Sequence, residues 1–556
     1  MSWSTPSYAL LLLVVLGANY LYAWLSFRKV MLARARGGFV APPVVPDFIP
    51  RISNSIQFVW NPTAFVSRII HFASKEHQNA VRLDVGPKSL YVIQGADNIR
   101  GLWKRSSALS SSANLYWPLM TLFGLAEKLA RNYLVEDSVV DGKDDPATSK
   151  HIGSISHHLI AGFLTGPGLS RLWGRYEKEL GEHFAQASKQ ESSGWIEQDD
   201  FTDLFAIDFT KLSLRALVGP VLLQLDPDFP RRFQEYSYAL PHLLRGEPRW
   251  WSPKPYQVRD SLVTSIKKWH EFARENFTPD SVAPDGDEDP YWGCAFFRKR
   301  QEVLGGIYEQ DYDALASEDF GFIYGSHHNV TFASFWVAFE VYRNATLLAR
   351  VRSEISASTS ATSSTGFDVD KLCKSPLLQS IWAETMRLRV HIFNTRNTRN
   401  EEHNINNWII PKNSTVFLTS TPAHMDESEW NTGENNEYPL DTFWAERFIK
   451  YPNNPHSGPM RKCATNSGAD SEGQPYYYFD ASMVGSWIPF GGGPYKCPGR
   501  HFAKREALML CALLVSNFDI ELIGDGDDVK MDWRTCGLGT LKPDRKIRYR
   551  IRKRSV

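Results

Sequence analysis

Apolar side chains recur along most of the chain at the three- and four-residue spacing of one face of an α-helix. This pattern predicts long helices over residues 170–186, 260–275, 320–342 and 377–389. Apolar and polar residues alternate instead on either side of Gly86-Pro87, which predicts a β-hairpin. Further short strands are predicted at residues 408–410 and 415–419 and near the C-terminus. The chain is therefore expected to fold as a mainly α protein with small β-sheets.

The charge of the chain does not indicate a nucleic-acid partner. It has 62 Lys and Arg residues and 62 Asp and Glu residues, so its formal net charge is zero, whereas nucleic-acid-binding domains are usually basic. Residues 546–554 are locally basic, but arginines alternate there with apolar residues. That alternation predicts a half-buried strand with one charged face, and no nucleic-acid partner is expected.

Residues 9–25 form an apolar run in which Asn19 is the only strongly polar residue. With its neighbours the run reaches the roughly 20 residues that a helix needs to span a bilayer. No charge precedes it, and four cations follow within residues 28–36. Positive charges after a span place the following body in the cytosol, whereas a cleaved signal peptide carries them before its apolar core. We therefore expect an uncleaved, single-pass signal-anchor at residues 1–27, with a buried core helix as the alternative.

The next segment, residues 28–50, combines basic residues with Pro42, Pro43, Pro46 and Pro50. Proline fixes φ and disfavours helix in the residue before it. This segment is therefore expected to be an extended, stiff linker. Residues 51–556 show no repeat and no second linker, and they are expected to form one large domain.

Residues 488–503 read IPFGGGPYKCPGRHFA and carry the most informative chemistry. Three glycines before a proline permit a tight backbone path close to something flat or bulky. A helical pattern begins soon after Gly499, so Cys497 is expected just before a helix N-terminus, where backbone amides lower the pKa of a thiol. The six cysteines form no C-x-x-C pair, and the glycines fit neither phosphate-binding pattern. Cys497 is therefore a candidate nucleophile or metal ligand.

The spacing of Phe490, Gly493, Cys497 and Gly499 resembles the signature of the cytochrome P450 family, the haem-thiolate monooxygenases. The resemblance implies that Cys497 is the axial thiolate on the iron of haem b. It also implies that Phe490, Gly493, Tyr495 and Gly499 belong to the cofactor-binding loop. Tyr495 departs from the family, which usually places a cation at this position toward a haem propionate.

A second landmark of the family lies upstream of this loop. Glu384 and Arg387 give its E-x-x-R motif on a predicted helix, where residues three apart share one face. The resemblance implies that Arg447 completes a structural triad with them. With these landmarks the resemblance covers essentially the whole chain. It implies the cytochrome P450 fold, preceded by one transmembrane helix, with residues 51–556 as the haem-thiolate catalytic domain.

Residues 324–336 fall where the family places its long central helix, which usually carries an acid and a threonine for proton delivery. Those positions hold Asn329 and Val330 here. Because the isopropyl group of Val330 cannot form a hydrogen bond, proton delivery is expected from another donor, such as Thr331, Ser326, ordered water or a substrate hydroxyl. Asn329 and Thr331 are the expected catalytic residues. The segment resembles the clan of sterol 7α- and 12α-hydroxylases and prostacyclin synthase. The two histidines before Asn329 point about 100° apart on a helix. One is therefore expected at the pocket and the other against a neighbouring helix, rather than both at one metal ion.

The resemblance implies a membrane-anchored enzyme that uses O2 to oxidise an apolar small molecule, such as a steroid, terpenoid or other secondary metabolite. It implies electrons from NADPH through NADPH–cytochrome P450 reductase, with cytochrome b5 as a further candidate partner, at the endoplasmic reticulum membrane. A haem-thiolate isomerase or dehydratase that needs neither O2 nor a reductase is the alternative, and a non-enzymatic haem carrier is the third possibility. The expected pocket lining comprises residues 106–122, 322–331, 390–394 and 536–541.

Overall fold

Helices build most of the protein, as the sequence pattern predicts. The computed structural model describes residues 5–74, 80–104, 109–110, 112–134, 151–189, 194–398, 401–461, 473–524 and 528–554. The α-helices are α1 Thr5–Ala35, α2 Ile52–Trp60, α3 Pro62–Ser74, α4 Ala96–Lys104, α5 Tyr116–Thr121, α6 Glu127–Ala130, α7 Ile152–Phe163, α8 Gly166–Lys189, α9 Phe201–Asp203, α10 Thr210–Val218, α11 Val221–Leu225, α12 Phe229–Leu244, α13 Pro253–Asn276, α14 Ala295–Ile307, α15 Tyr312–Tyr342, α16 Ala345–Ile355, α17 Val369–Leu372, α18 Pro376–Arg389, α19 Ser420–His424 and α20 Arg500–Asn517.

The strands are short and form small sheets. They are β1 Val81–Val85, β2 Lys88–Val92, β3 Leu109–Ser110, β4 Ile196–Gln198, β5 Val390–Thr398, β6 His403–Ile405, β7 Trp408–Ile410, β8 Thr415–Thr419, β9 Ile449–Lys450, β10 Tyr476–Tyr477, β11 Phe518–Leu522, β12 Leu538–Thr540 and β13 Tyr549–Lys553. The largest sheet has the order β1-β2-β8-β5-β12, with β3 also paired to β5. Strands β1 and β2 form the predicted antiparallel hairpin, whose turn holds Gly86 at a φ of 52°. The basic C-terminal segment pairs as β13 between β11 and β4.

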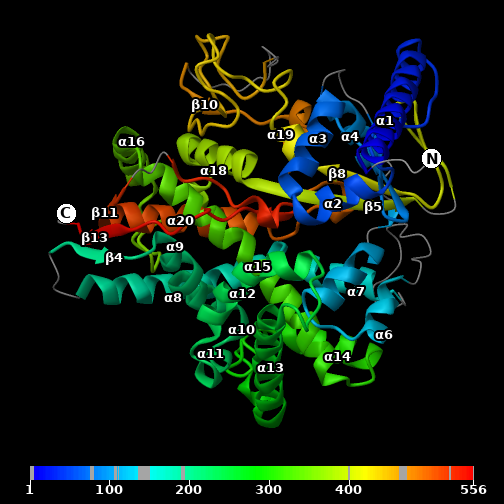
Figure 1. The fold of residues 1–556 in the computed structure, drawn as a ribbon. Helices are drawn as coiled ribbons and strands as arrows, with labels where there is room; N and C mark the ends of the chain where they lie inside the picture. Colours follow the sequence, from blue (N-terminus) through cyan, green and yellow to red (C-terminus); the bar gives the residue numbers. More distant parts are fainter. Residues whose placement is uncertain are drawn as a thin grey trace.

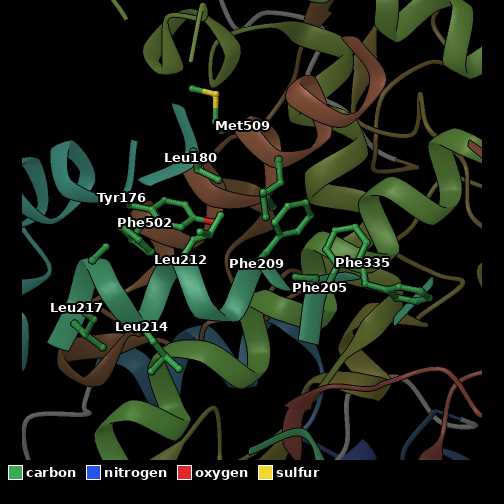
Figure 2. Close-up of a cluster of buried hydrophobic side chains, with 14 of the residues drawn as sticks. Tyr176, Leu180, Phe205, Phe209, Leu212, Leu214, Leu217, Phe335, Phe502 and Met509 are labelled. Carbon is green, nitrogen blue, oxygen red and sulfur yellow. The ribbon is translucent and has the colours of Figure 1, made fainter. Parts of the chain in front are cut away.

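Helix α15 runs through the middle of the body, as Figure 1 shows. Nearly all of its side chains are buried, because a helix that is apolar on every side needs partners on every side. Helices α8 to α13 lie on one side of it, and the sheet that contains β5 and β8 lies on the other, beside α2 and α3 (Figure 1). Aromatic and aliphatic side chains fill the space between α8, α10, α15 and α20, including Tyr176, Phe209, Phe335 and Phe502 (Figure 2). This core fixes α15 and α20 relative to each other.

Helix α1 is long and apolar enough to cross a membrane. It continues to Ala35, so residues 28–35, expected in the linker, are its last two turns. The second half of the helix lies against the body: the Asn19 side chain donates to the carbonyls of Asp47 and Phe48 at 3.1 and 3.0 Å. The proline-rich segment that follows is extended, and Val40 bridges Trp408 of β7. The stiff part of the predicted linker is thus shorter than the sequence indicates.

Candidate functional site

A cavity of about 490 Å³ lies beneath α15, between the loop that precedes α20 and the strands β5 and β12. Its lining is mostly apolar and comes from segments far apart in the sequence. The lining residues include Ile160, Leu164, Ser213, Phe322, Gly325, Ser326, His327, Asn329, Val330, Ala333, Met386, Ile392, Phe393, Asn394, Phe490, Tyr495, Cys497, Gly499, Phe502, Leu538 and Thr540. An apolar enclosure of this kind excludes water and favours apolar ligands.

The loop before α20 brings Cys497 to the wall of this cavity. The Cys497 amide donates to the Phe490 carbonyl at 3.0 Å. Gly491 and Gly493 have φ values of 67° and 66°, which glycine adopts without the strain that a side chain would cause. A Cβ on Gly491 would also meet the Asn394 side chain at 2.9 Å. The glycines therefore allow the loop to turn back tightly and present the cysteine sulfur to the cavity.

Two opposing effects act on the pKa of the Cys497 thiol. Burial raises the pKa of the Cys497 thiol, and the amides of Gly499 and Arg500 only partly oppose this effect. Desolvation disfavours the thiolate more than the helix N-terminus stabilises it. Coordination to a metal ion deprotonates a thiol outright, so the sulfur is better suited to a metal cation than to the role of a free nucleophile.

The other predicted loop residues surround this cysteine. Phe490 lines the cavity and stacks on Trp382 of α18, with 6.5 Å between the ring centroids. Gly499 lines the cavity and caps the start of α20. Gly493 begins a short 3₁₀ turn and shapes the loop without lining the cavity. Tyr495 also lines the cavity. The structure thus brings these loop residues together around Cys497.

A buried cation that the sequence analysis missed lies beside Tyr495. Arg396 of β5 is 4% exposed, and its guanidinium carbon lies 5.1 Å from the centre of the Tyr495 ring. Its Nη1 donates to the Thr395 carbonyl at 2.8 Å and its Nη2 to the Gly492 carbonyl at 3.5 Å. Its Nε has no hydrogen-bond partner, and no carboxylate of a described residue pairs with it. Burial lowers the pKa of Arg396. A buried, unpaired guanidinium is costly, so this position is suited to a bound anion.

These observations test whether haem fits the cavity. Haem needs an axial donor for its iron and polar partners for its two carboxylates. Cys497 offers a sulfur, and two buried donor atoms have no partner: Nδ2 of Asn394, which lines the cavity, and Nε of Arg396, which lies next to the cavity-lining Tyr495. His157 of α7 lies close by, 5.3 Å from the Tyr495 ring between centroids. The residues present therefore fit haem. In the sequence, Arg396 could have been identified as the arginine in the strand that follows the E-x-x-R helix.

Glu384, Arg387 and Arg447 form a triad in which each side chain has an exposed fraction of 0%. Arg387 donates to both carboxylate oxygens of Glu384 at 2.7 and 2.8 Å, and Arg447 Nε donates to the same carboxylate at 3.0 Å. Arg387 also donates to the carbonyls of His424 and Leu440 at 2.8 and 2.7 Å. Burial alone would raise the pKa of Glu384, but the two arginines hold it below its ordinary value. The triad ties α18 to the segments before the cysteine loop.

On α15, the two residues expected to act in catalysis point in different directions. Asn329 and Val330 line the cavity, and Asn329 Oδ1 accepts a hydrogen bond from the Thr540 amide at 2.9 Å. Thr331 does not line the cavity, because its hydroxyl faces Thr210, with 3.4 Å between the two Oγ1 atoms. Successive helical residues point about 100° apart, which explains the difference. Of the two residues, Asn329 is therefore the one that faces the cavity.

The adjacent histidines of α15 face different surroundings, as the helical geometry predicts. His327 lines the cavity, and its Nδ1 lies 2.8 Å from the Ile323 carbonyl oxygen. His328 faces α12, where its Nδ1 lies 3.2 Å from Ser237 Oγ. Burial lowers the pKa of His327 to about 4 and that of His328 to about 3. Both are therefore neutral at physiological pH, and no group of three metal-ligating side chains occurs within the described parts of the chain.

Three of the four segments expected to line the pocket contribute to it. Residues from 322–331, 390–394 and 536–541 line the cavity. Of the first expected segment, residues 106–108 and 111 lie outside the described part of the chain, and the described residues of 109–122 do not line the cavity. Gly539 is required where β12 meets α15, because a Cβ there would lie 1.9 Å from Asn329 Oδ1.

Comparison with known proteins supports the assignment of this site. A family model described as "Cytochrome P450" matches residues 232–549. "Cytochrome P450 monooxygenase fsoE" of Humicola fuscoatra is 30% identical, over 96% of this chain and 92% of the relative. "Cytochrome P450 monooxygenase efuG" of Hormonema carpetanum is 28% identical, over 100% and 98% of the two chains. "Cholesterol 7-alpha-monooxygenase" of Cricetulus griseus is 24% identical over 58% of each chain. The chain therefore belongs to the cytochrome P450 family, as an oxidoreductase of the monooxygenase class whose fold implies a haem held by a cysteine thiolate.

Proposed function

We propose that this chain is a membrane-anchored monooxygenase that binds haem b through the Cys497 thiolate and hydroxylates an apolar small molecule. The observation that carries the proposal is that the Cys497 sulfur and Tyr495 line one cavity, with the buried guanidinium of Arg396 against the Tyr495 ring. When bound, a haem-thiolate supplies the activation of O2 for insertion of oxygen into the substrate. Arg396 and Asn394 would hold its carboxylates, and Phe490 and Trp382 would pack against it.

The cavity lining supports an apolar substrate. Val330, Ile392, Phe393 and Leu538 present hydrocarbon surface to the cavity, and such surface binds steroid- or terpenoid-like compounds better than charged ones. One similar protein is named for its action on cholesterol, which favours a steroid, a terpenoid or another secondary metabolite of similar polarity.

The proposal also includes a membrane anchor and redox partners. Helix α1 would anchor the enzyme as a single pass in the endoplasmic reticulum membrane, with the body in the cytosol because cations follow the apolar run. NADPH–cytochrome P450 reductase would deliver electrons from NADPH, and cytochrome b5 is a further candidate donor. The first two turns of α20, which follows the Cys497 loop, carry Arg500, Lys504 and Arg505, which supports docking of an acidic redox partner.

Oxygen and NADPH should both be required for product formation. The full chain, loaded with haem, would be incubated with the reductase, NADPH and a panel of steroids and terpenoids that starts with cholesterol. We expect a product heavier by one oxygen atom, with the label of ¹⁸O2 in it, by mass spectrometry. Reactions without O2 or without the reductase should give none. Product formed in the absence of both would establish the isomerase or dehydratase class instead.

Removing the polar group of Asn329 should change the ratio of product to NADPH consumed, whereas removing that of Thr331 should not. We expect Asn329→Ala to lower the ratio of product to NADPH consumed several-fold, because Asn329 is a polar residue of α15 that lines the cavity next to Val330. The matched control is Thr331→Val, which should leave that ratio unchanged, because the Thr331 hydroxyl faces Thr210. Equal ratios in both variants and the wild type would make Asn329 a packing residue only.

A further inference from the structure

Helix α12 contains a proline in its interior. Pro241 has no amide hydrogen, so the helical hydrogen bond to the carbonyl four residues earlier, that of Ser237, cannot form. Ser237 is 3% exposed. A buried carbonyl without a donor costs free energy comparable to a lost hydrogen bond, so the structure has to supply a donor from elsewhere.

That donor is Lys542, in the segment that follows β12. Its Nζ donates to the Ser237 carbonyl at 3.2 Å, and the residue is 1% exposed. The ammonium also lies 3.8 Å from the centre of the Tyr238 ring and 3.7 Å from Asp532 Oδ2. The aromatic face and the carboxylate offset the cost of burying the charge. Lys542 thus takes the place of the missing amide of Pro241.

The segment that carries Lys542 also forms the wall of the cavity. Two residues earlier, the Thr540 amide donates to Asn329 Oδ1 at 2.9 Å. The Leu541 carbonyl accepts a hydrogen bond from Trp336 Nε1 of α15 at 2.7 Å. Three successive residues therefore attach the end of β12 to α15 and to α12.

Helix α12 contacts the cavity wall from the other side. Phe233 packs on His327, with 6.2 Å between the ring centroids, and His327 lines the cavity. Ser237 Oγ lies 3.2 Å from His328 Nδ1, one position further along α15. A shift of α12 that hydrated the Ser237 carbonyl would therefore move side chains that support the cavity.

We propose that Lys542 is a positioning residue for the substrate pocket: it replaces the helical hydrogen bond that Pro241 removes, and so holds α12 against the cavity-lining segment. The inference rests on the proposed function, because it takes the cavity as the haem and substrate site. It predicts that the shape of the pocket, rather than the haem attachment, depends on Lys542.

The test uses the full-length, haem-loaded protein and two azoles of different size. Imidazole probes access to the haem alone, whereas clotrimazole also needs the space around it. In Lys542→Met the hydrocarbon stem is largely kept and the donor is lost. Because a hydrogen bond from a charged group is worth about a tenfold to hundredfold change in an equilibrium, we expect the clotrimazole Kd to rise by roughly tenfold. The imidazole Kd should stay unchanged, as measured by optical titration.

A second change should reverse the effect. Pro241→Ala restores the amide that can donate to the Ser237 carbonyl, so the double variant Pro241→Ala/Lys542→Met should regain wild-type clotrimazole affinity. Lys542→Arg, which keeps a cationic donor, should also regain it. Lys546→Met is the matched control, because Lys546 is an exposed lysine in the same segment, and it should have no effect.

The outcomes separate this inference from the proposed function. An unchanged clotrimazole Kd in Lys542→Met, or a double variant that does not recover, would overturn the role of Lys542. If Lys542→Met does not fold, recovery of folding and binding in the double variant supports the inference, and failure of the double variant contradicts it. If the haem-loaded wild-type protein did not bind imidazole at all, that result would contradict the proposed haem site itself.

Discussion

Cys497→Ser should abolish the thiolate-type optical spectrum of the reduced carbon monoxide complex and, with it, all monooxygenase turnover. A serine hydroxyl is a far poorer ligand for haem iron than a thiolate, and the thiolate is what promotes cleavage of the O–O bond. The expected loss of turnover is complete, so it is the largest effect predicted for this protein. Spectra of the purified variant and product analysis by mass spectrometry measure it.

The matched control for this change is Cys373→Ser. Cys373 follows α17 and does not line the cavity, so its replacement should leave the spectrum and turnover intact. A thiolate spectrum that survives in Cys497→Ser would mean that another residue binds the iron, and the assignment of the cavity would then be wrong.

Glu384→Gln should greatly reduce the yield of folded, haem-loaded protein. The substitution keeps the size of the side chain but leaves Arg387 and Arg447 buried without a counter-charge. Breaking a buried ion pair in this way costs about 3–5 kcal/mol. Arg387→Met should have a similar effect, because it leaves the Glu384 carboxylate with one arginine and removes two hydrogen bonds to backbone carbonyls. Thermal unfolding and haem content per chain measure both variants.

An exposed pair with the same spacing provides the control. Lys299 and Glu302 are three residues apart on α14, with 3.0 Å between Nζ and Oε2 and both side chains more than half exposed. Exposed ion pairs contribute little, so Glu302→Gln should leave the melting temperature and haem content unchanged. If Glu384→Gln melted like Glu302→Gln with full haem, the triad would be no more important than a surface pair.

Sequence reasoning was most successful where a local pattern determines the structure. Strands β7 and β8 have the predicted ends, because short apolar runs between turn residues define them. The E-x-x-R triad was also predictable, because Glu384 and Arg387 lie on one helix face, and the family resemblance pointed to Arg447. The family assignment rested on the spacing around Cys497, which is local as well.

Contacts between distant segments could not be predicted in the same way. Helix α15 is buried on nearly every side, so its periodicity does not indicate which face meets the cavity, and the sequence alone does not show that the Thr331 hydroxyl faces Thr210. Arg396 appears in the sequence as one cation in a strand, and its burial beside Tyr495 depends on how β5 packs. The contact of Lys542 with Ser237 joins residues 305 positions apart, and only the folded chain brings them together.

The packing of α1 on the body limits how a soluble form of the enzyme can be designed. Phe27 and Met31 lie in the second half of that helix, are each 8% exposed, and belong to the same apolar cluster as the β1–β2 hairpin. A deletion that ended at Ala35 would remove these two core side chains together with the apolar span. Each contributes roughly 1.5–3 kcal/mol by its burial. A truncated form that starts just before Phe27 would keep both, so the helix is best divided within its length rather than removed whole.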